Sequence, residues 1–474
     1  MADLATPEIE VTPLTPEVSG FERMAVDALR LLPGFKRVSA SQRVIRAMRG
    51  GIWTIVGYGA GQVLRLASTL VLARMLVPQA FGLVALANVF ISGLEMLSDL
   101  GIGMDVVQHK RGDDPTFINT AYLIQAGRGI IIWLVATAIA YPFAKFYHQP
   151  ALIALAIVSS LSILLRASAS GSIWTLTRHV KLRELTILNT GSDFVGFLVS
   201  VIWAVVSPTA WALVVGRVAA AAVLSLGSHI IAENPVSTAW DRSAAREIFA
   251  FGAGIFLSTS TYFIGGEAER LVVGKFITLV ELGCFSLALS ISSAVAKGLQ
   301  QVVGQVFFPM MSDSLRQNQS RSHEDFKKAR HLVLILSVCV SCGFVIGSKW
   351  LVHVLLGPKY AMAGWMLQLL GVRGALELFT SVTASMLFAL GTSRYAAIGN
   401  VAKLAFLAVG LSVAFTRFGF HEALWVLTLA PLANYIPLLV GLGHHSKLVT
   451  RTELASFAGF TLITALIVVV CHAV

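Results

Sequence analysis

Seven cationic side chains lie within long apolar stretches of this sequence. They are Arg65, Arg128, Arg166, Arg217, Lys297, Arg373 and Lys403. A charge inside a membrane-spanning helix is expensive, so it usually faces a bundle interior or a water-filled cavity and serves a function. Arginine also presents a planar set of donors that fits phosphate. These residues therefore predict a cationic cleft that binds an anionic cargo.

Acidic and polar residues accompany the cations. Those expected in the same cleft, some of them with a role in ion coupling, are Gln62, Glu95, Asp99, Asp193 and Glu269. Glu95 and Asp99 are four residues apart and share a helix face. They could share a proton, coordinate a sodium ion, or neutralise Arg65 on the neighbouring helix, and the last interpretation is favoured. The same spacing between Arg373 and Glu377 allows these two residues to pair with each other.

Polar residues also form stripes along three of the expected helices. The stripes run from Tyr58 to Thr69, from Asn88 to Asp99 and from Ser286 to Gln301, at steps of three and four residues. Such steps place side chains on one helical face, so we expect these three helices to wall the cleft. Arg166 and Asp99 lie near the cytoplasmic ends of their spans, where their charges could instead extend to the membrane interface.

The composition indicates a membrane protein built from helices. Apolar residues make up 56% of the 474 residues and charged residues only 13%, against about 45–50% and about 25% in soluble domains. The apolar residues come in runs of about 20, the length that a helix needs to cross a bilayer. The net charge of +11 is spread over short loops, which is typical of membrane topology and does not indicate nucleic-acid binding.

The apolar runs predict thirteen spans with the amino terminus in the cytoplasm, because basic residues concentrate in alternate loops. The predicted spans are residues 52–73, 82–104, 117–140, 151–173, 186–206, 209–231, 250–273, 282–307, 331–355, 362–390, 395–416, 420–442 and 455–473. The main basic residues left on the opposite side are Arg74, Lys145, Lys275, Lys359 and Arg417. The longest loops, 233–249 and 312–331, are expected to be solvated cytoplasmic linkers.

One stretch of the sequence occurs twice. "LVLARMLVPQAFGLVALA" begins at Leu70, and "LVVGKFITLVELGCFSLA" begins 201 residues further along, with Gly82 matched by Gly283. "RELTILN" and "RYAAIGN" follow as a second matched pair. Six spans separate the copies, so both halves start from the same face and form a parallel duplication. The two glycines are expected to permit a tight turn between spans.

The duplication predicts four regions and one architecture. The regions are a cytoplasmic tail with an amphipathic helix (1–50), two six-helix lobes (51–232 and 249–443) and an additional helix (455–473). The expected architecture is an all-α polytopic membrane protein of 12–14 transmembrane helices, with two pseudo-twofold six-helix lobes around a central cationic cleft. Rocking of the lobes would open this cleft to either side in turn.

The sequence gives no support for an enzyme. It has no G-x-x-x-x-G-K-[ST] phosphate-binding loop, no long loop that could form a catalytic domain, and no histidine spacing typical of a metal site. Its four cysteines lie in or beside apolar runs without the spacing of a metal or redox site. We therefore predict no catalytic residues, no cofactor and no metal.

Two segments resemble a known family. "LARMLVPQAFGLVALANVF" followed by "LSDLGIGMDVVQ" is similar to the opening two-span signature of bacterial polysaccharide flippases, and "RLVVGKFITLVELGCFSLA" is similar to the matching stretch of their second half. These flippases belong to the multidrug/oligosaccharidyl-lipid/polysaccharide exporter superfamily. The resemblance extends from about residue 50 to residue 440. Members commonly have twelve or fourteen spans, so thirteen is a departure, as is Glu269–Arg270 where relatives often show a lone acid.

The resemblance implies a cargo of sugar units on an undecaprenyl-pyrophosphate carrier, moved to the outer leaflet of the bacterial inner membrane for polysaccharide biosynthesis. The sugars would cross through the cleft while the lipid tail stays in the bilayer. H⁺ or Na⁺ is the candidate coupling ion, and a polysaccharide polymerase or co-polymerase is a candidate partner. Arg65, Arg128, Arg217 and Lys297 would meet the anionic headgroup. The alternatives are an ion-coupled drug or metabolite antiporter, a membrane-embedded glycan polymerase or ligase, and a scaffold of glycan assembly.

Overall fold

The computed structural model describes residues 42–232, 237, 239–266, 268–317, 319–392, 394–445, 451, 453–462 and 464. All regular structure in these ranges is helical, as predicted. A chain embedded in lipid must pair its backbone groups internally, and a helix does so within one segment. Residues 1–41 of the predicted tail lie outside the described residues.

The helices divide between the two copies of the repeat. Those of the first half are α2 (Gln42–Met75), α3 (Pro78–Met96), α4 (Ile102–Gln108), α5 (Pro115–Phe146), α6 (Ala151–Ala167), α7 (Ser172–Arg178), α8 (Leu182–Val206) and α9 (Trp211–Ile230). Those of the second half are α10 (Arg242–Gly266), α11 (Ala268–Phe276), α12 (Leu279–Gln317), α13 (Gln319–Leu355), α14 (Ala363–Ala389), α15 (Arg394–Arg417) and α16 (Phe420–His445), with the short 3₁₀ turn η2 (Pro358–Tyr360) before α14.

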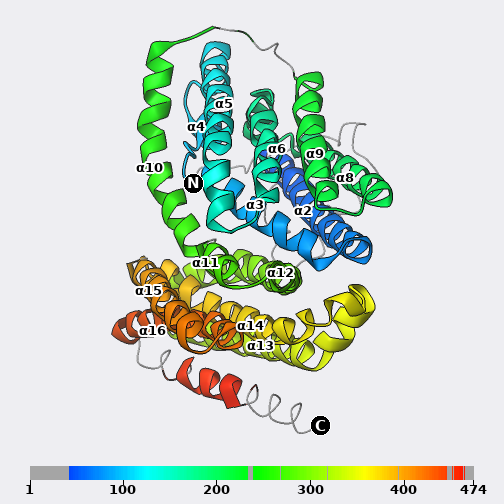
Figure 1. Cartoon of the computed structure of the whole chain (residues 1–474). Coiled ribbons are helices and arrows are strands. Elements are labelled where there is room, and N and C mark those ends of the chain that lie inside the picture. Colours follow the sequence, from blue (N-terminus) through cyan, green and yellow to red (C-terminus); the bar gives the residue numbers. More distant parts are fainter. Residues whose placement is uncertain are drawn as a thin grey trace, which may run out of the picture.

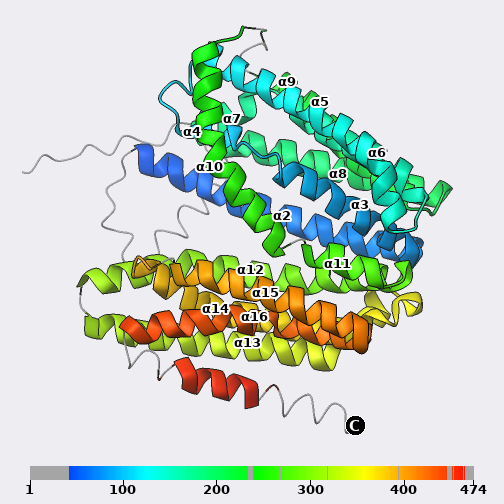
Figure 2. The same ribbon diagram turned by 60° about the vertical axis from the view of Figure 1, so that its left-hand side comes forward.

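The helices form two groups, α2–α9 and α12–α16 (Figure 1). α2 and α3 lie on the side of the first group that faces α11 and α12, and α3 packs directly against α12. Figure 2 shows the groups close together at the end where α3 and α12 begin and farther apart at the opposite end. The loops predicted to be cytoplasmic lie at the wider end.

Within the described ranges, eight helices are long and apolar enough to span a membrane. The pair α6 and α7 makes a ninth if it counts as one span, although it bends by 59°. The predicted span 82–104 is wrong in its second part, because the chain leaves the helix after Met96. Gly101 there adopts a left-handed φ of 58°, which glycine tolerates, and its N–H donates to Asp99 Oδ1 at 3.0 Å.

The second predicted linker, 312–331, is largely helical, and the first, 233–249, is helical from Arg242 onward. α12 and α13 extend through most of residues 312–331, and α10 begins at Arg242 within the first linker. Ala244, Ala245 and Ile248 of α10 pack with α4 and α5 of the first half. Arg111 also binds Asp241 at 2.7 Å, and this hydrogen bond lowers the pKa of Asp241. The prediction of two solvated linkers is therefore wrong in these helical parts. An amphipathic helix at the end of a bundle contains about as many polar residues as a loop, so composition alone does not separate the two.

The last predicted span, 455–473, is described only in part. Residues 453–462 and residue 464 are helical, and the remainder lies outside the described residues. The matched segments of the repeat do begin equivalent helices: "RELTILN" opens α8 and "RYAAIGN" opens α15.

The repeated glycines lie at a contact between the two copies. A β-carbon added at Gly82 would be 2.2 Å from the carbonyl oxygen of Leu279, and one added at Gly283 would be 2.0 Å from that of Pro78. Pro78 and Leu279 are the first residues of α3 and α12, so each glycine packs against the start of the other copy's helix. The expected role in a tight turn is therefore wrong: the glycines permit close approach of two helices related by the repeat.

Candidate functional site

Two of the predicted cations lie on α2 and α12, the helices at the facing sides of the two groups. Arg65 belongs to α2 and Lys297 to α12, and both side chains are exposed. Within the described residues neither side chain has a hydrogen bond or an ion pair. In particular, Arg65 forms no ion pair there with Glu95 or Asp99, so the favoured pairing is wrong. Both charges are therefore available to a ligand, and Figures 1 and 2 show that the two helices which carry them, α2 and α12, lie on neighbouring sides of the two groups.

Arg217 lies in the interior of the first group. Its guanidinium donates to the side-chain oxygen of Asn88, which belongs to the polar stripe on α3. The charges of Glu95 and Arg166 also act on it, one attracting and the other repelling. Arg166 itself is exposed. The first half therefore gathers two cations, an acid and an amide from α3, α6 and α9.

Arg128 on α5 binds the C-terminal end of α3. Its Nε donates to the backbone oxygen of Ser98 at 2.7 Å, and one terminal nitrogen donates to the backbone oxygen of Glu95 at 2.7 Å. Carbonyl groups at a helix C-terminus lack partners within the helix and carry partial negative charge. The charges of Glu95 and Asp99 attract the same guanidinium. The Arg128 guanidinium therefore binds the carbonyl groups at the C-terminal end of α3. Glu95 and Asp99 supply negative charge beside it.

Arg373 is the centre of a buried chain of charges in the second half. Both terminal nitrogens of its guanidinium bind Glu269, at 2.9 and 3.0 Å, and Nε binds Glu377 at 3.2 Å. The Arg373 and Glu269 side chains are only 9% and 5% exposed. Lys403 Nζ lies 3.6 Å from the same Glu377 oxygen. The pairing of Arg373 with Glu377 is confirmed, while Glu269, which is far away in the sequence, is its stronger partner.

We expect Glu269→Gln to lower the thermal stability of the protein. The amide keeps the shape of the side chain but leaves the buried Arg373 guanidinium with less negative charge, at a cost of about 1–3 kcal/mol. Unfolding of the purified protein in detergent measures the change. Glu377→Gln is the matched control, because the Glu377 side chain is 33% exposed and its loss is better compensated by solvent. An equal or larger loss from Glu377→Gln would contradict this ranking.

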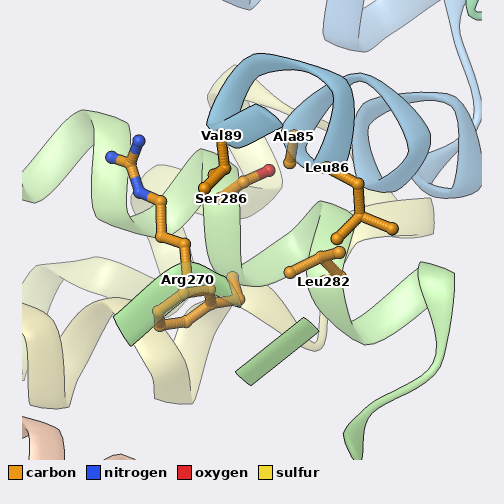
Figure 3. A pocket seen from close by; sticks show the side chains of 7 residues that line it. Ala85, Leu86, Val89, Arg270, Leu282 and Ser286 are labelled. Atoms are coloured by element: carbon orange, nitrogen blue, oxygen red, sulfur yellow. The ribbon is translucent and has the colours of Figure 1, made fainter. Parts of the chain in front are cut away.

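The charge chain ends at a polar cavity of about 230 Å³ in the second half. Its polar lining is Gln300, Glu377, Thr380, Ser381, Lys403 and Asn434. A second, much smaller cavity of about 10 Å³ lies at the contact of α3, α11 and α12. Figure 3 shows Arg270 there, with its guanidinium directed away from the apolar side chains of Leu86 and Leu282. This second cavity is too small for any cargo.

Two predicted site residues remain: Gln62 on α2 is half-buried, and Asp193 on α8 is exposed. Neither side chain has a hydrogen bond or an ion pair within the described residues. The structure therefore sorts the predicted residues into three clusters: the exposed cations of α2 and α12, the residues inside the first half, and those inside the second. It also contains a buried pair that the sequence did not indicate, Arg330 with Glu453. Arg330 directly precedes an apolar run, so it was assigned to a cytoplasmic loop.

Comparison with known proteins identifies the family. The family described as "Polysaccharide biosynthesis protein" matches residues 71–363, which is more than half of the chain. The chain belongs to this family. Among curated relatives of this family member, the amylovoran biosynthesis protein AmsL of Erwinia amylovora is 25% identical over 60% of this chain and 74% of the relative. The lipopolysaccharide biosynthesis protein WzxC of Escherichia coli (strain K12) is 21% identical over 73% of this chain and 70% of the relative.

Solved structures of low sequence identity share the fold of this polysaccharide biosynthesis protein. The lipid II flippase MurJ in an inward closed conformation aligns with a TM-score of 0.64 at 12% identity, over 89% of this chain and 98% of MurJ. A multidrug resistance transporter of the MATE family, in an inward-facing conformation, aligns with a TM-score of 0.56, also at 12% identity, over 85% of this chain and 96% of that one. The fold of this family member is therefore that of a polytopic transporter.

Proposed function

We propose that this protein is a flippase that moves lipid-linked oligosaccharides across the bacterial inner membrane by alternating access of its two halves. The cargo is a glycan on undecaprenyl pyrophosphate, taken up on the cytoplasmic side, where the amino terminus lies. The observation that carries the proposal is the pair of exposed, unpaired cations, Arg65 and Lys297, on the two facing helices of a chain from a polysaccharide biosynthesis family. A flippase fold and relatives that act in polysaccharide biosynthesis support it.

The geometry refines which cations serve the cargo. Arg128 and Arg373 use their donors on backbone carbonyls or buried acids, so they position helices. Arg65 and Lys297 are therefore the first candidates to bind the pyrophosphate. Arg217 is the next candidate, because one of its nitrogens already donates to Asn88. No chemical bond changes in this process, so the protein is a carrier and not an enzyme. A polymerase that consumes the flipped glycan is the expected downstream partner, and H⁺ or Na⁺ the expected coupling ion.

We expect Arg65→Ala and Lys297→Ala each to reduce export by about 10- to 100-fold, because a charge-assisted contact with the pyrophosphate contributes about 1.5–3 kcal/mol. The measurement compares exported polymer, and lipid-linked glycan retained on the cytoplasmic side, in cells that carry only the variant. Membrane levels of the protein should stay equal.

Lys349→Ala is the control for this test. Lys349 is an exposed lysine on α13, a helix that carries none of the predicted site residues, and its loss should leave export unchanged. Normal export by both Arg65→Ala and Lys297→Ala at normal membrane levels would contradict the proposed function.

A further inference from the structure

Four turns at the narrow end of the molecule exchange hydrogen bonds between its two halves. They join α2 to α3, α5 to α6, α11 to α12, and α13 to α14. The residues that make the exchange are Arg74, Tyr147, Lys275 and Tyr360, which we call the outer clasp. Arg74 and Lys275 occupy matching positions of the repeat, and the clasp residues play no part in the three clusters described above.

The first arm of the clasp joins the end of α2 to the end of α13. Arg74 Nε donates to the backbone oxygen of Leu355, the last residue of α13, at 3.1 Å. Lys359 Nζ donates in return to the backbone oxygen of Arg74 at 2.8 Å. The Tyr360 hydroxyl, fully buried, donates to the backbone oxygen of Leu76 at 3.0 Å. A cation and a tyrosine thus connect the first helix of one half with the third long helix of the other.

The second arm repeats this arrangement with the halves exchanged. Lys275, near the end of α11, donates to the backbone oxygen of Phe146, the last residue of α5, and its Nζ lies 4.2 Å from the centre of the Phe146 ring. The Tyr147 hydroxyl donates to the backbone oxygen of Leu271 at 2.9 Å. Burial raises the pKa of Tyr147 to about 12, so the hydroxyl keeps the proton that it donates. Each half therefore holds the other with one clasp cation and one tyrosine, and Lys359 adds a further donor to the first arm.

These hydrogen bonds can break and re-form without leaving a charge unpaired in an apolar environment. The cations Arg74, Lys275 and Lys359 all donate to carbonyls at helix C-termini, which lack a partner within the helix and attract cations, whereas Tyr147 donates to Leu271 inside α11. When the halves separate, the same carbonyls, ammonium and guanidinium can all bind water, so no charge is stranded in an apolar core. The contact of Gly82 and Gly283 lies directly beside the clasp, at the start of α3 and α12. The clasp and this contact together close the narrow end.

We propose that the outer clasp is the gate that seals the outer end of the cleft, and that both arms open when the cleft turns to the outside. This inference rests on the proposed alternating access. It predicts that weakening either pair of clasp residues raises access to the cleft from the outer side while the protein still folds.

The test uses a reporter cysteine at Ser290, an exposed position in the polar stripe of α12. The four native cysteines, Cys284, Cys339, Cys342 and Cys471, are first replaced by alanine or serine. A membrane-impermeant methanethiosulfonate reagent is then applied to right-side-out vesicles and to inside-out vesicles. In the parent protein we expect fast labelling only from the cytoplasmic side.

Two double variants weaken the clasp without removing its packing. Tyr147→Phe/Tyr360→Phe deletes only the two hydroxyl groups, and Arg74→Gln/Lys275→Gln deletes the two charges. We expect each to raise the rate of labelling from outside on the order of three- to ten-fold, since each loses two contacts that hold the closed state. An outside rate equal to that of the parent in both double variants would overturn the proposal. So would a rise confined to the cytoplasmic side.

The matched controls are Tyr141→Phe and Lys145→Gln, which are exposed residues near the same end of α5. A rise of the same size in Lys145→Gln would attribute the effect to surface charge and overturn the assignment. Labelling requires no glycan. A wrong cargo would therefore leave these results unchanged, whereas a clasp that has no effect would leave the cargo assignment standing.

Discussion

Replacing Gly283 with alanine is expected to reduce polymer export at least ten-fold and to lower stability by about 1–3 kcal/mol. The added β-carbon would lie 2.0 Å from the carbonyl oxygen of Pro78, so α3 and α12 must move apart. This contact is made by backbone, which cannot rotate away as a long side chain can. Because α3 and α12 meet beside the proposed clasp, their separation should also increase labelling of a cysteine at Ser290 from outside.

Gly82→Ala should have the same effect, because its β-carbon would lie 2.2 Å from the carbonyl oxygen of Leu279. The control is Gly347→Ala on α13, where nothing lies within 4 Å of the added carbon. Alanine is the better helix former by about 1 kcal/mol, so this variant should be neutral or more stable. The three variants are compared by thermal unfolding in detergent and by export. The contact would be contradicted if Gly82→Ala and Gly283→Ala were as stable and as active as Gly347→Ala.

The repeat in the sequence indicated which helices of the two halves are equivalent. The matched stretches Leu70–Ala87 and Leu271–Ala288 both run from the end of one helix into the next, from α2 into α3 and from α11 into α12. It could not assign the role of the glycines. A turn and a close approach both select glycine, and the partner helix begins about 200 residues away. Only the three-dimensional contact of Gly82 with Leu279 distinguishes the two roles.

The charges were predicted less completely, for a similar reason. A spacing of four residues correctly indicated that Arg373 pairs with Glu377. It could not indicate Glu269, because no periodicity connects residues on different helices. Arg128 was predicted to meet a headgroup, whereas the end of α3 satisfies its donors. That helix ends at Met96, inside a largely apolar stretch from residue 82 to 104 that conceals the break in the sequence.

Glu453→Gln is expected to destabilise the protein by about 3–5 kcal/mol, because it leaves the buried charge of Arg330 uncompensated. Both side chains are fully buried. Glu453 Oε1 accepts hydrogen bonds from Arg330, Thr383 and Tyr435, the last at 2.8 Å. The Arg330 guanidinium also lies 3.3 Å from the centre of the Phe379 ring. Glu453 thus fixes residues 453–462 to the second half, and protease cleavage after residue 445 should accelerate in the variant.

The double variant Arg330→Met/Glu453→Gln separates the buried charge from the shape of the site. Methionine fills the guanidinium volume without charge, while the glutamine oxygen can still accept from Tyr435 and Thr383. Replacing both members of a buried ion pair is often nearly neutral, whereas removing one is not. We therefore expect the double variant to recover most of the stability lost in Glu453→Gln, measured as a double-mutant cycle of thermal unfolding.

Glu422→Gln, at an acid whose side chain is 49% exposed, is the control and should change stability by less than about 0.5 kcal/mol. Losses that simply add in the double variant would show that Arg330 and Glu453 stabilise the fold independently, contrary to a paired charge.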